Sequence, residues 1–190
     1  MLNQTEGASE EGRVLPEFLD RLMGVGVLLI NSAFEATQDG VTAPIVPDIN
    51  GLEAAVAVAR ATVPAKLSGK EIRFLRKALG LRATALAEFL DVTPETFSRW
   101  ENGKETISNN PERILRLRVV HGRRGRALGV KAASDAVLDL KISPFRMSVA
   151  PTTLKFDRVE VVQDGEFKKI WRYLGVAEQE DAQPLSVSVA

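Results

Sequence analysis

The sequence predicts a mainly α-helical protein with small β modules: a central helical domain flanked by an N-terminal αβ module and a C-terminal β-rich segment. Helix-capping signals and apolar residues with helical spacing dominate the middle of the chain, from 66 to 140. Beyond Pro144 the pattern changes to the two-residue alternation of β-strands. The chain has 190 residues, of which 45% are hydrophobic and 26% charged, which is enough for one or two domains with apolar cores.

The central domain is expected to contain five helices. Its first helix should begin at Ser68, because "SGKE" is a capping box in which the Ser68 hydroxyl accepts from the Glu71 amide while the Glu71 side chain reaches back. Gly80 should end that helix. The five predicted helices cover residues 68–79, 83–90, 94–102, 110–122 and a last segment that ends at 140.

Residues 81–104, "LRATALAEFLDVTPETFSRWENGK", predict a helix-turn-helix whose second helix can lie in a DNA major groove. Asp91 tolerates the left-handed backbone that such a turn requires. Thr93 is the expected N-cap of the second helix, with Pro94 at its first position and Gly103 at its end. The apolar residues expected between the two helices are Leu86, Leu90, Val92, Phe97 and Trp100.

The segment "FSRWENGK" resembles the recognition-helix end of the Cro/phage-repressor (XRE) class of helix-turn-helix regulators. The longer run "LSGKEIRFLRKALGLRATALAEFLDVTPETFSRWENGK" looks most like the MqsA-type (YgiT-type) bacterial antitoxins and transcriptional regulators. This resemblance covers about residues 66–120 and implies a five-helix Cro/repressor-like DNA-binding domain. It also implies an N-terminal zinc ribbon held by four thiolates, but the chain has no cysteine. A degenerate, ribbon-like module without metal is therefore expected.

Arg99 is the strongest candidate for a base contact, because a guanidinium can pair with O6 and N7 of guanine. The resemblance maps a base-reading arginine onto Arg99 and a second base-reading position onto Glu95; the alternative is that Arg99 touches only a phosphate. Thr93 is expected to contact a phosphate from the helix N-terminus. Arg82 stands where the family usually has a capping residue, and it could supply a phosphate contact instead. The full candidate set for DNA binding is Arg82, Thr93, Glu95, Thr96, Ser98, Arg99, Lys104, Arg123, Arg124 and Arg126.

The net charge of zero hides a segregation of charge along the chain. Residues 1–65 carry three basic and nine acidic side chains, whereas residues 66–131 carry fifteen basic and seven acidic ones. Because the basic block coincides with the helix-turn-helix, it favours a phosphate-binding surface. Within it, a second basic cluster is either a solvated helix face or, around its two glycines, a flexible arm that grips phosphate. Its members are Arg113, Arg116, Arg118, Arg123, Arg124 and Arg126.

The N-terminal flank is expected to combine a small sheet with one helix. Val14 to Met23 predicts a short helix, and β-rich runs on both sides of Gln38-Asp39-Gly40 predict an antiparallel pair. The Ala-rich helix that follows should have Asn50 as its N-cap. Without metal, the sheet must be held by apolar packing against this helix near Ala54 to Val58. The apolar residues expected in that contact are Val25, Val27, Leu28, Leu29 and Ile30.

The C-terminal module should contain strands at 145–150 and 153–162, a turn at Asp164-Gly165, and a strand or short helix at 167–175. The predicted boundaries are a mobile tail at 1–13, the ribbon-like module at 14–65, the DNA-binding domain at 66–140, the β-rich module at 141–176 and a mobile tail at 177–190.

Several classes of function are disfavoured. The lack of cysteine excludes disulfides and a thiolate zinc site. No apolar run approaches the length of a membrane span, so a cytoplasmic, nucleoid-associated protein is expected. His121 is the single histidine and stands at a predicted helix end, where a capping role is favoured. No catalytic set emerges, and neither enzymatic activity nor a cofactor is expected.

The sequence thus predicts a regulator that binds double-stranded DNA, expected to act as a homodimeric autorepressor on a pseudo-palindromic operator, since one such domain reads too few base pairs. The expected dimer surface is Val130 to Leu140 together with the strands from Phe145 to Val162; the alternative is that this sheet folds back on its own domain. A different function remains open. The protein could be an antitoxin-like interaction module that neutralises a partner toxin through its N-terminal or C-terminal part.

Overall fold

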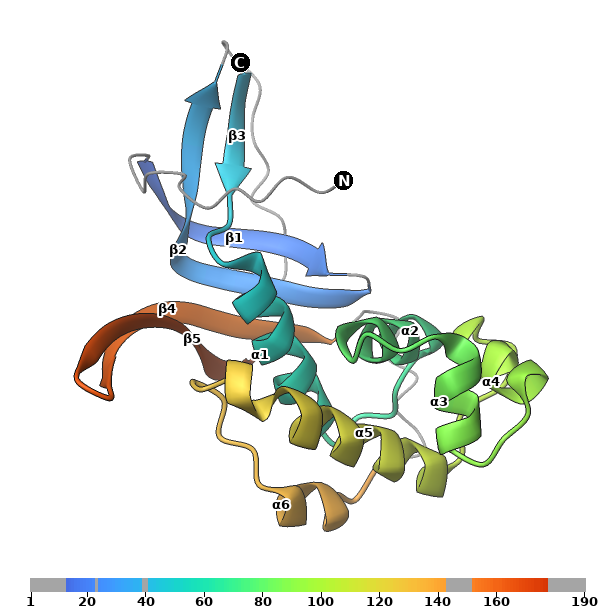
Figure 1. Cartoon of the computed structure of the whole chain (residues 1–190). Coiled ribbons are helices and arrows are strands. Elements are labelled where there is room, and N and C mark those ends of the chain that lie inside the picture. The colour runs from blue at the N-terminus through green and yellow to red at the C-terminus, as the bar shows by residue number, and fades with distance from the viewer. Residues whose placement is uncertain (1–12, 23, 39–40, 143–151, 178–190) are drawn as a thin grey trace.

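The computed structural model describes residues 13–22, 24–38, 41–142 and 152–177, and in these ranges it combines six α-helices with one mixed five-stranded sheet (Figure 1). The strands are β1 (Arg13–Leu22), β2 (Val25–Gln38), β3 (Val41–Ile45), β4 (Thr153–Gln163) and β5 (Glu166–Val176). The helices are α1 (Ile49–Thr62), α2 (Gly69–Ala78), α3 (Ala83–Phe89), α4 (Pro94–Glu101), α5 (Asn109–Arg123) and α6 (Ser134–Leu138), with a 3-10 helix η1 (Arg124–Arg126). The helical middle of the chain agrees with the expectation, whereas the β-structure is one large sheet and not two small modules.

The sheet has the strand order β1-β2-β4-β5, and β3 pairs with the second half of β2. The pairs β1–β2, β2–β3 and β4–β5 are antiparallel, but β2 and β4 pair in parallel, with Gly26–Ile30 beside Thr153–Asp157. The two β segments expected as separate modules therefore share one sheet. Asn31 has a φ of 48°, and a register shift in the β1–β2 pair lies opposite it. Beyond this bend the β2–β3 and β4–β5 hairpins leave the sheet in different directions (Figure 1).

The expected helix from Val14 to Met23 is wrong over the part that the structure describes, because residues 13–22 form β1. Leu15, Phe18, Leu19 and Leu22 have helical spacing, which is what the pattern detected. In a strand, the same spacing places two of these side chains on each face, and all four are half-buried. The hydrogen-bonded pairing with β2 favours the strand over the helix for these residues. At the other end of the chain, the segment left open between strand and helix forms β5.

Helix α1 begins at a different cap from the one expected. Its N-cap is Asp48 and not Asn50: the Asp48 side chain accepts from the Gly51 amide at 3.0 Å. A Cβ on residue 51 would lie 2.0 Å from an Asp48 carboxylate oxygen, so a larger residue there would force the Asp48 side chain out of its capping position. Residues 54–61 of α1 are buried without interruption, because the sheet covers one side of the helix and α5 covers the other (Figure 1). Trp171 of β5 donates its Nε1 hydrogen to the Asp48 carbonyl at 3.1 Å.

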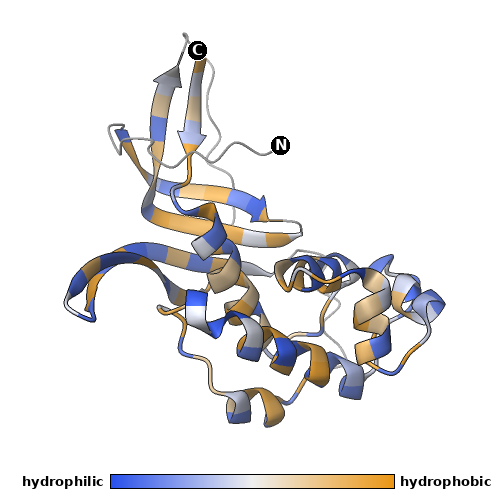
Figure 2. Cartoon of the chain, in the orientation of Figure 1, coloured by the Kyte–Doolittle hydropathy of each residue, from blue (hydrophilic) through white to orange (hydrophobic). Residues whose placement is uncertain are grey.

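The apolar packing expected for the N-terminal strands is found in part. Val25, Val27 and Leu29 belong to the same buried cluster as α1, and Figure 2 colours this stretch of β2 mostly hydrophobic. Leu28 is buried outside that cluster, and Ile30 is only half-buried. Among the described residues, no group of three or more histidine, cysteine, aspartate or glutamate side chains could hold a metal ion.

We expect a chelator to leave the melting temperature of the purified protein unchanged, because apolar contacts of Val25, Val27 and Leu29 hold the N-terminal strands where thiolates would hold a ribbon. Thermal unfolding with and without EDTA, together with elemental analysis of the same sample, measures this. Stoichiometric zinc and a chelator-induced fall in melting temperature would together contradict it.

Part of the surface expected to form a dimer is buried within the chain, while Leu138 and Val162 are exposed. Val130 and Val137 are buried, and β4 lies between β2 and β5, so β4 has no free edge along the residues that pair with β2. The expected strand at 145–150 lies outside the described residues. The helix expected up to Leu140 is the short α6. In the part of the chain that is described, no helix is long and apolar enough to cross a membrane.

Candidate nucleic-acid interface

Helices α3 and α4 cross at the turn that the sequence predicts. Asp91 has a φ of 55°, and the Val92 amide donates to the Ala87 carbonyl at 3.0 Å. The Thr93 side chain caps α4 by accepting from the Thr96 amide at 3.2 Å. Of the residues expected between the helices, Val92 is half-buried and the others are buried: Leu86, Leu90, Phe97 and Trp100. Ala87 is also buried there. The helix-turn-helix geometry is therefore confirmed.

Helix α2 fixes the far end of α4. Arg76 donates from Nε to a Glu101 carboxylate oxygen at 2.7 Å and from Nη1 to the Leu81 carbonyl at 2.8 Å. The Arg73 guanidinium donates to the Asn102 side chain at 2.8 Å. Gly69 at the start of α2 lies so close that a Cβ there would be 2.5 Å from the Trp100 carbonyl oxygen. These contacts hold α4 in one position relative to the rest of the domain.

The outward side of α4 carries most of the candidate base-reading residues. Thr93, Glu95, Ser98 and Arg99 are exposed, and Thr96 is half-buried. The Ser98 hydroxyl accepts a hydrogen bond of 3.3 Å from the side-chain nitrogen Nδ2 of Asn102, at the end of the same helix. Arg99, by contrast, has no hydrogen-bond or ion-pair partner among the described residues, and its guanidinium is available to a ligand.

Two further candidates flank this helix. Arg82 is the exposed N-cap of α3 and makes no side-chain cap bond there, which agrees with the loss of the usual capping residue. Lys104 is exposed directly after the left-handed Gly103 that ends α4. Both side chains are therefore exposed to solvent next to the helix-turn-helix.

The three remaining candidates lie elsewhere. Arg123 ends α5, and Arg124 and Arg126 belong to η1, which packs against α1 and is not a free arm. With 15 residues, α5 is about 22 Å long, and its beginning follows the loop after α4. Figure 1 shows η1 at the opposite end of α5 from α4. The structure does not bring this basic group together with the recognition helix.

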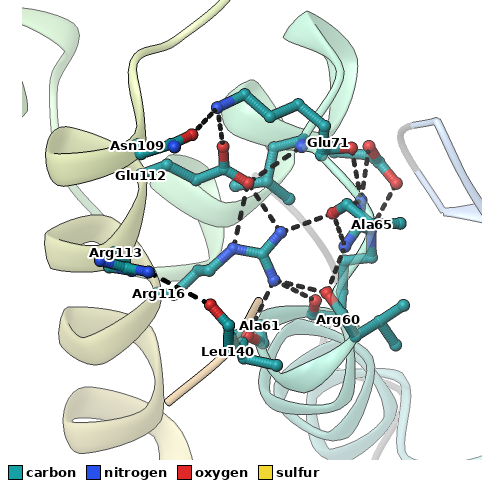
Figure 3. Close-up of polar contacts among 12 residues, drawn as sticks. Arg60, Ala61, Ala65, Glu71, Asn109, Glu112, Arg113, Arg116 and Leu140 are labelled. Atoms are coloured by element: carbon teal, nitrogen blue, oxygen red, sulfur yellow. Dashed lines mark hydrogen bonds and ion pairs between the residues drawn. The ribbon is translucent and has the colours of Figure 1, made fainter. Parts of the chain in front are cut away.

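Arg116 is not part of a solvated helix face. Its guanidinium is fully buried and forms an ion pair with Glu112 at 2.7 Å (Figure 3). It also donates to four main-chain carbonyls in the last turn of α1 and just beyond it: those of Arg60 at 3.3 Å, Ala61 at 2.9 Å, Val63 at 2.7 Å and Ala65 at 2.6 Å. One side chain of α5 thus satisfies the carbonyl groups that the end of α1 leaves open.

A second buried arginine completes this arrangement, which we call the ion cluster: Arg60, Lys66, Glu71, Glu112 and Arg116. Arg60 forms two hydrogen bonds with Glu71 and donates to the Ala65 carbonyl at 3.1 Å. Glu71 also accepts from the Ser68 amide at 2.7 Å, so the predicted capping box and a buried ion pair share one carboxylate. Lys66 lies 2.8 Å from Glu112. The ion cluster ties α1, α2 and α5 together.

Burial lowers the pKa of Arg116, and the neighbouring Arg60 lowers it further, while Glu112 acts in the opposite direction. The pKa of an arginine side chain is normally so far above neutral pH that Arg116 stays charged.

Two features of the sequence indicated this cluster but were not used in the prediction. Arg60 is the single charged residue in the Ala/Val-rich segment 54–61. Glu112 and Arg116 have the i, i+4 spacing of a helical ion pair and lie beside the apolar Leu115.

In a comparison with known protein families, a family model described as Helix-turn-helix matches residues 72–110. This span covers about a fifth of the chain and contains α3, the turn and α4 in full. No curated protein and no solved structure matches the chain. The central region is thus an XRE-type helix-turn-helix, the class of domain that binds DNA.

Proposed function

We propose that this protein is a sequence-specific transcriptional regulator that reads DNA bases with the exposed side of α4. The observation that carries the proposal is the unpaired, exposed Arg99 on a recognition helix that Arg73, Arg76 and Gly69 hold rigidly in place. A guanidinium on such a helix can form two hydrogen bonds with one guanine.

The distribution of charge supports the same proposal. Three acidic residues of the basic block, Glu71, Glu101 and Glu112, point inward and are used up in buried ion pairs. The exposed side chains around α3 and α4 include Arg82, Arg99 and Lys104. DNA phosphates are attracted to such a surface, and the affinity should fall steeply with salt.

We further propose that two copies act together on a pseudo-palindromic operator in the promoter of the protein's own gene. One domain of this size reads only a few base pairs, which is too little to select one site among many. A two-fold pair reads two half-sites separated by one helical turn, about 34 Å, or by a multiple of it.

Replacing Arg99 by alanine is expected to cost about 1–3 kcal/mol of binding free energy on the specific site and little on random DNA, because only the specific site offers the paired guanine acceptors. The site is first isolated by selection from a random duplex library with the wild-type protein. Dissociation constants of both proteins are then measured at one salt concentration on the selected and on a scrambled duplex.

Two control variants sharpen this test. Lys104→Ala is expected to weaken both duplexes alike and to reduce the salt slope by about 1, as the loss of a phosphate contact should. Arg124→Ala is expected to change binding less, because η1 lies at the far end of α5. An equal loss on both duplexes for Arg99→Ala would reduce that residue to a phosphate contact, and failure to select any duplex would refute specific binding.

A second candidate function is an antitoxin-like one, in which the sheet binds a partner toxin and DNA binding is secondary. The observation that favours it is the set of exposed apolar side chains on the sheet away from α4, such as Val41 and Phe167. Co-expression with the product of the neighbouring gene tests it: a stoichiometric complex that relieves growth arrest supports this function, and no complex refutes it.

A further inference from the structure

Ser98 presents a hydroxyl group on the exposed side of α4, one position before Arg99. Its oxygen accepts the 3.3 Å hydrogen bond from Nδ2 of Asn102, and the same nitrogen donates to the Ser98 carbonyl at 2.9 Å. Among the described residues, no group accepts the hydrogen of this hydroxyl. The hydroxyl hydrogen of Ser98 is therefore a donor that an external ligand can use.

The side chain of Asn102 is held in one orientation by Arg73 of α2. Nη2 of Arg73 donates to Oδ1 of Asn102 at 2.8 Å. A guanidinium can only donate and a main-chain carbonyl can only accept. The contacts with Arg73 and with the Ser98 carbonyl therefore require the same orientation, with Oδ1 toward Arg73 and Nδ2 toward Ser98.

The neighbouring ion pairs hold Arg73 itself. Its Nε lies 3.8 Å from a Glu101 carboxylate oxygen, and Arg76 donates to the other oxygen of that carboxylate at 2.7 Å. The direction of the hydrogen bond between Asn102 and Ser98 is thus set from α2, outside the recognition helix. We call Arg73, Asn102 and Ser98 the hydroxyl relay.

The relay determines what the Ser98 hydroxyl offers. A hydroxyl group has one hydrogen and two lone pairs, and Asn102 occupies one of the lone pairs. The hydrogen must then point away from Asn102. In the major groove, guanine, adenine and thymine each present an acceptor atom, whereas cytosine presents only the hydrogens of its amino group. A donor on Ser98 therefore suits the first three bases and does not suit cytosine.

We propose that the hydroxyl relay makes Ser98 a hydrogen-bond donor to a DNA base, so that this residue selects against cytosine at a second position of the site read by Arg99. Ser98 is the specificity-determining residue, and Arg73 and Asn102 are positioning residues that act through it. This inference rests on the proposed reading of DNA by α4. A phosphate oxygen would accept from the same hydroxyl, but a phosphate contact creates no preference among bases.

A specificity profile of the Ser98 variants tests the base contact. The duplex selected with the wild-type protein is varied to all four base pairs at every position, and each dissociation constant is measured at one salt concentration. Ser98→Ala is expected to reduce the preference at one position by about 3- to 10-fold, as the loss of one neutral hydrogen bond should. This position differs from the one that Arg99→Ala relaxes. Ser98→Thr retains a hydroxyl group and is expected to retain the preference.

Replacing Asn102 by aspartate tests the relay, because a carboxylate can only accept. The new side chain accepts from Arg73 and from the Ser98 hydroxyl, so that only lone pairs of Ser98 face the DNA. At the position that Ser98→Ala relaxes, cytosine is expected to gain about 3- to 10-fold over the base that the wild-type protein prefers. The added negative charge weakens all duplexes alike. Asn110→Asp, at the exposed start of α5, adds the same charge and should leave the profile unchanged.

Arg73→Ala is a second variant for the relay, at an exposed position. It leaves the Asn102 amide free to turn over, so the preference at the same position should fall while circular dichroism shows a folded protein. An equal loss on all duplexes for Ser98→Ala overturns the inference, because Ser98 then contacts a phosphate. So does a preference that survives both Asn102→Asp and Arg73→Ala.

The outcomes separate this inference from the proposed function. If Arg99→Ala relaxes one position and Ser98→Ala relaxes none, only the role of Ser98 is refuted. If the wild-type protein selects no duplex, specific DNA binding is refuted, and the role of Ser98 with it.

Discussion

Replacing Arg116 by alanine is expected to lower the free energy of unfolding by about 3–5 kcal/mol, although the residue lies in a basic stretch that reads as surface. The substitution removes one of the two ion-pair partners of the fully buried Glu112. It also removes the Arg116 donor from the carbonyl groups of Ala61, Val63 and Ala65, of which the last two keep only their longer hydrogen bonds from Arg60. Burying an unpaired carboxylate costs far more than the loss of an exposed ion pair, and Lys66 compensates for it only in part.

Urea unfolding followed by circular dichroism measures this loss. Arg126→Ala is the matched control, because this arginine is exposed on η1; its effect should stay within about 0.5 kcal/mol. A loss below about 1 kcal/mol for Arg116→Ala would show that the ion cluster contributes little to stability. Because Arg116 lies in the interior, its loss should weaken specific and random DNA binding in parallel with the folded fraction.

A fragment of residues 66–142 is expected not to unfold cooperatively, although it contains the whole helix-turn-helix. Helix α1 packs along α5, where Leu115 and Val119 are fully buried, and it supplies Arg60 to the ion cluster. Without α1, the apolar side of α5 faces water and Glu71 loses its partner, while the entropic cost of ordering the remaining helices is unchanged.

Thermal and urea unfolding of this fragment test the expectation. A longer fragment, residues 46–142, retains α1 and is the control; it should regain a cooperative transition below the midpoint of the full chain. If residues 66–142 alone unfolded with the midpoint of the full chain, α1 would not belong to the structural unit that supports the helix-turn-helix.

The helix-turn-helix could be predicted from sequence because its signals are local. The capping box at Ser68, the left-handed Asp91, the Thr93-Pro94 start and the left-handed Gly103 each depend on residues a few positions away. Local rules of this kind are satisfied or broken within a single turn of helix. For the same reason Arg99 could be assigned to the exposed side of α4 without a structure.

The rest of the fold depends on pairing and packing between elements, which the pattern of one element does not contain. Strand β1 has the apolar spacing of a helix and becomes a strand only because β2 pairs with it. Arginine is a residue type usually found at the surface, and Arg116 is buried because the end of α1 lies against α5. The Arg116 donors bind carbonyl groups more than 50 positions earlier in the chain, so no short sequence window around Arg116 contains its partners.

The parallel pairing of β2 with β4 also affects how the chain is made. Val27 pairs with Leu154, which is 127 positions later, so β2 leaves the ribosome long before its neighbour exists. At about 5–20 residues per second, translation of the intervening chain takes roughly 6–25 s. During that interval the Val27-Leu28-Leu29 run is a site for chaperones or for pairing with another nascent chain. Slowing translation between the two strands should therefore lower the yield of native protein more than slowing it after β5.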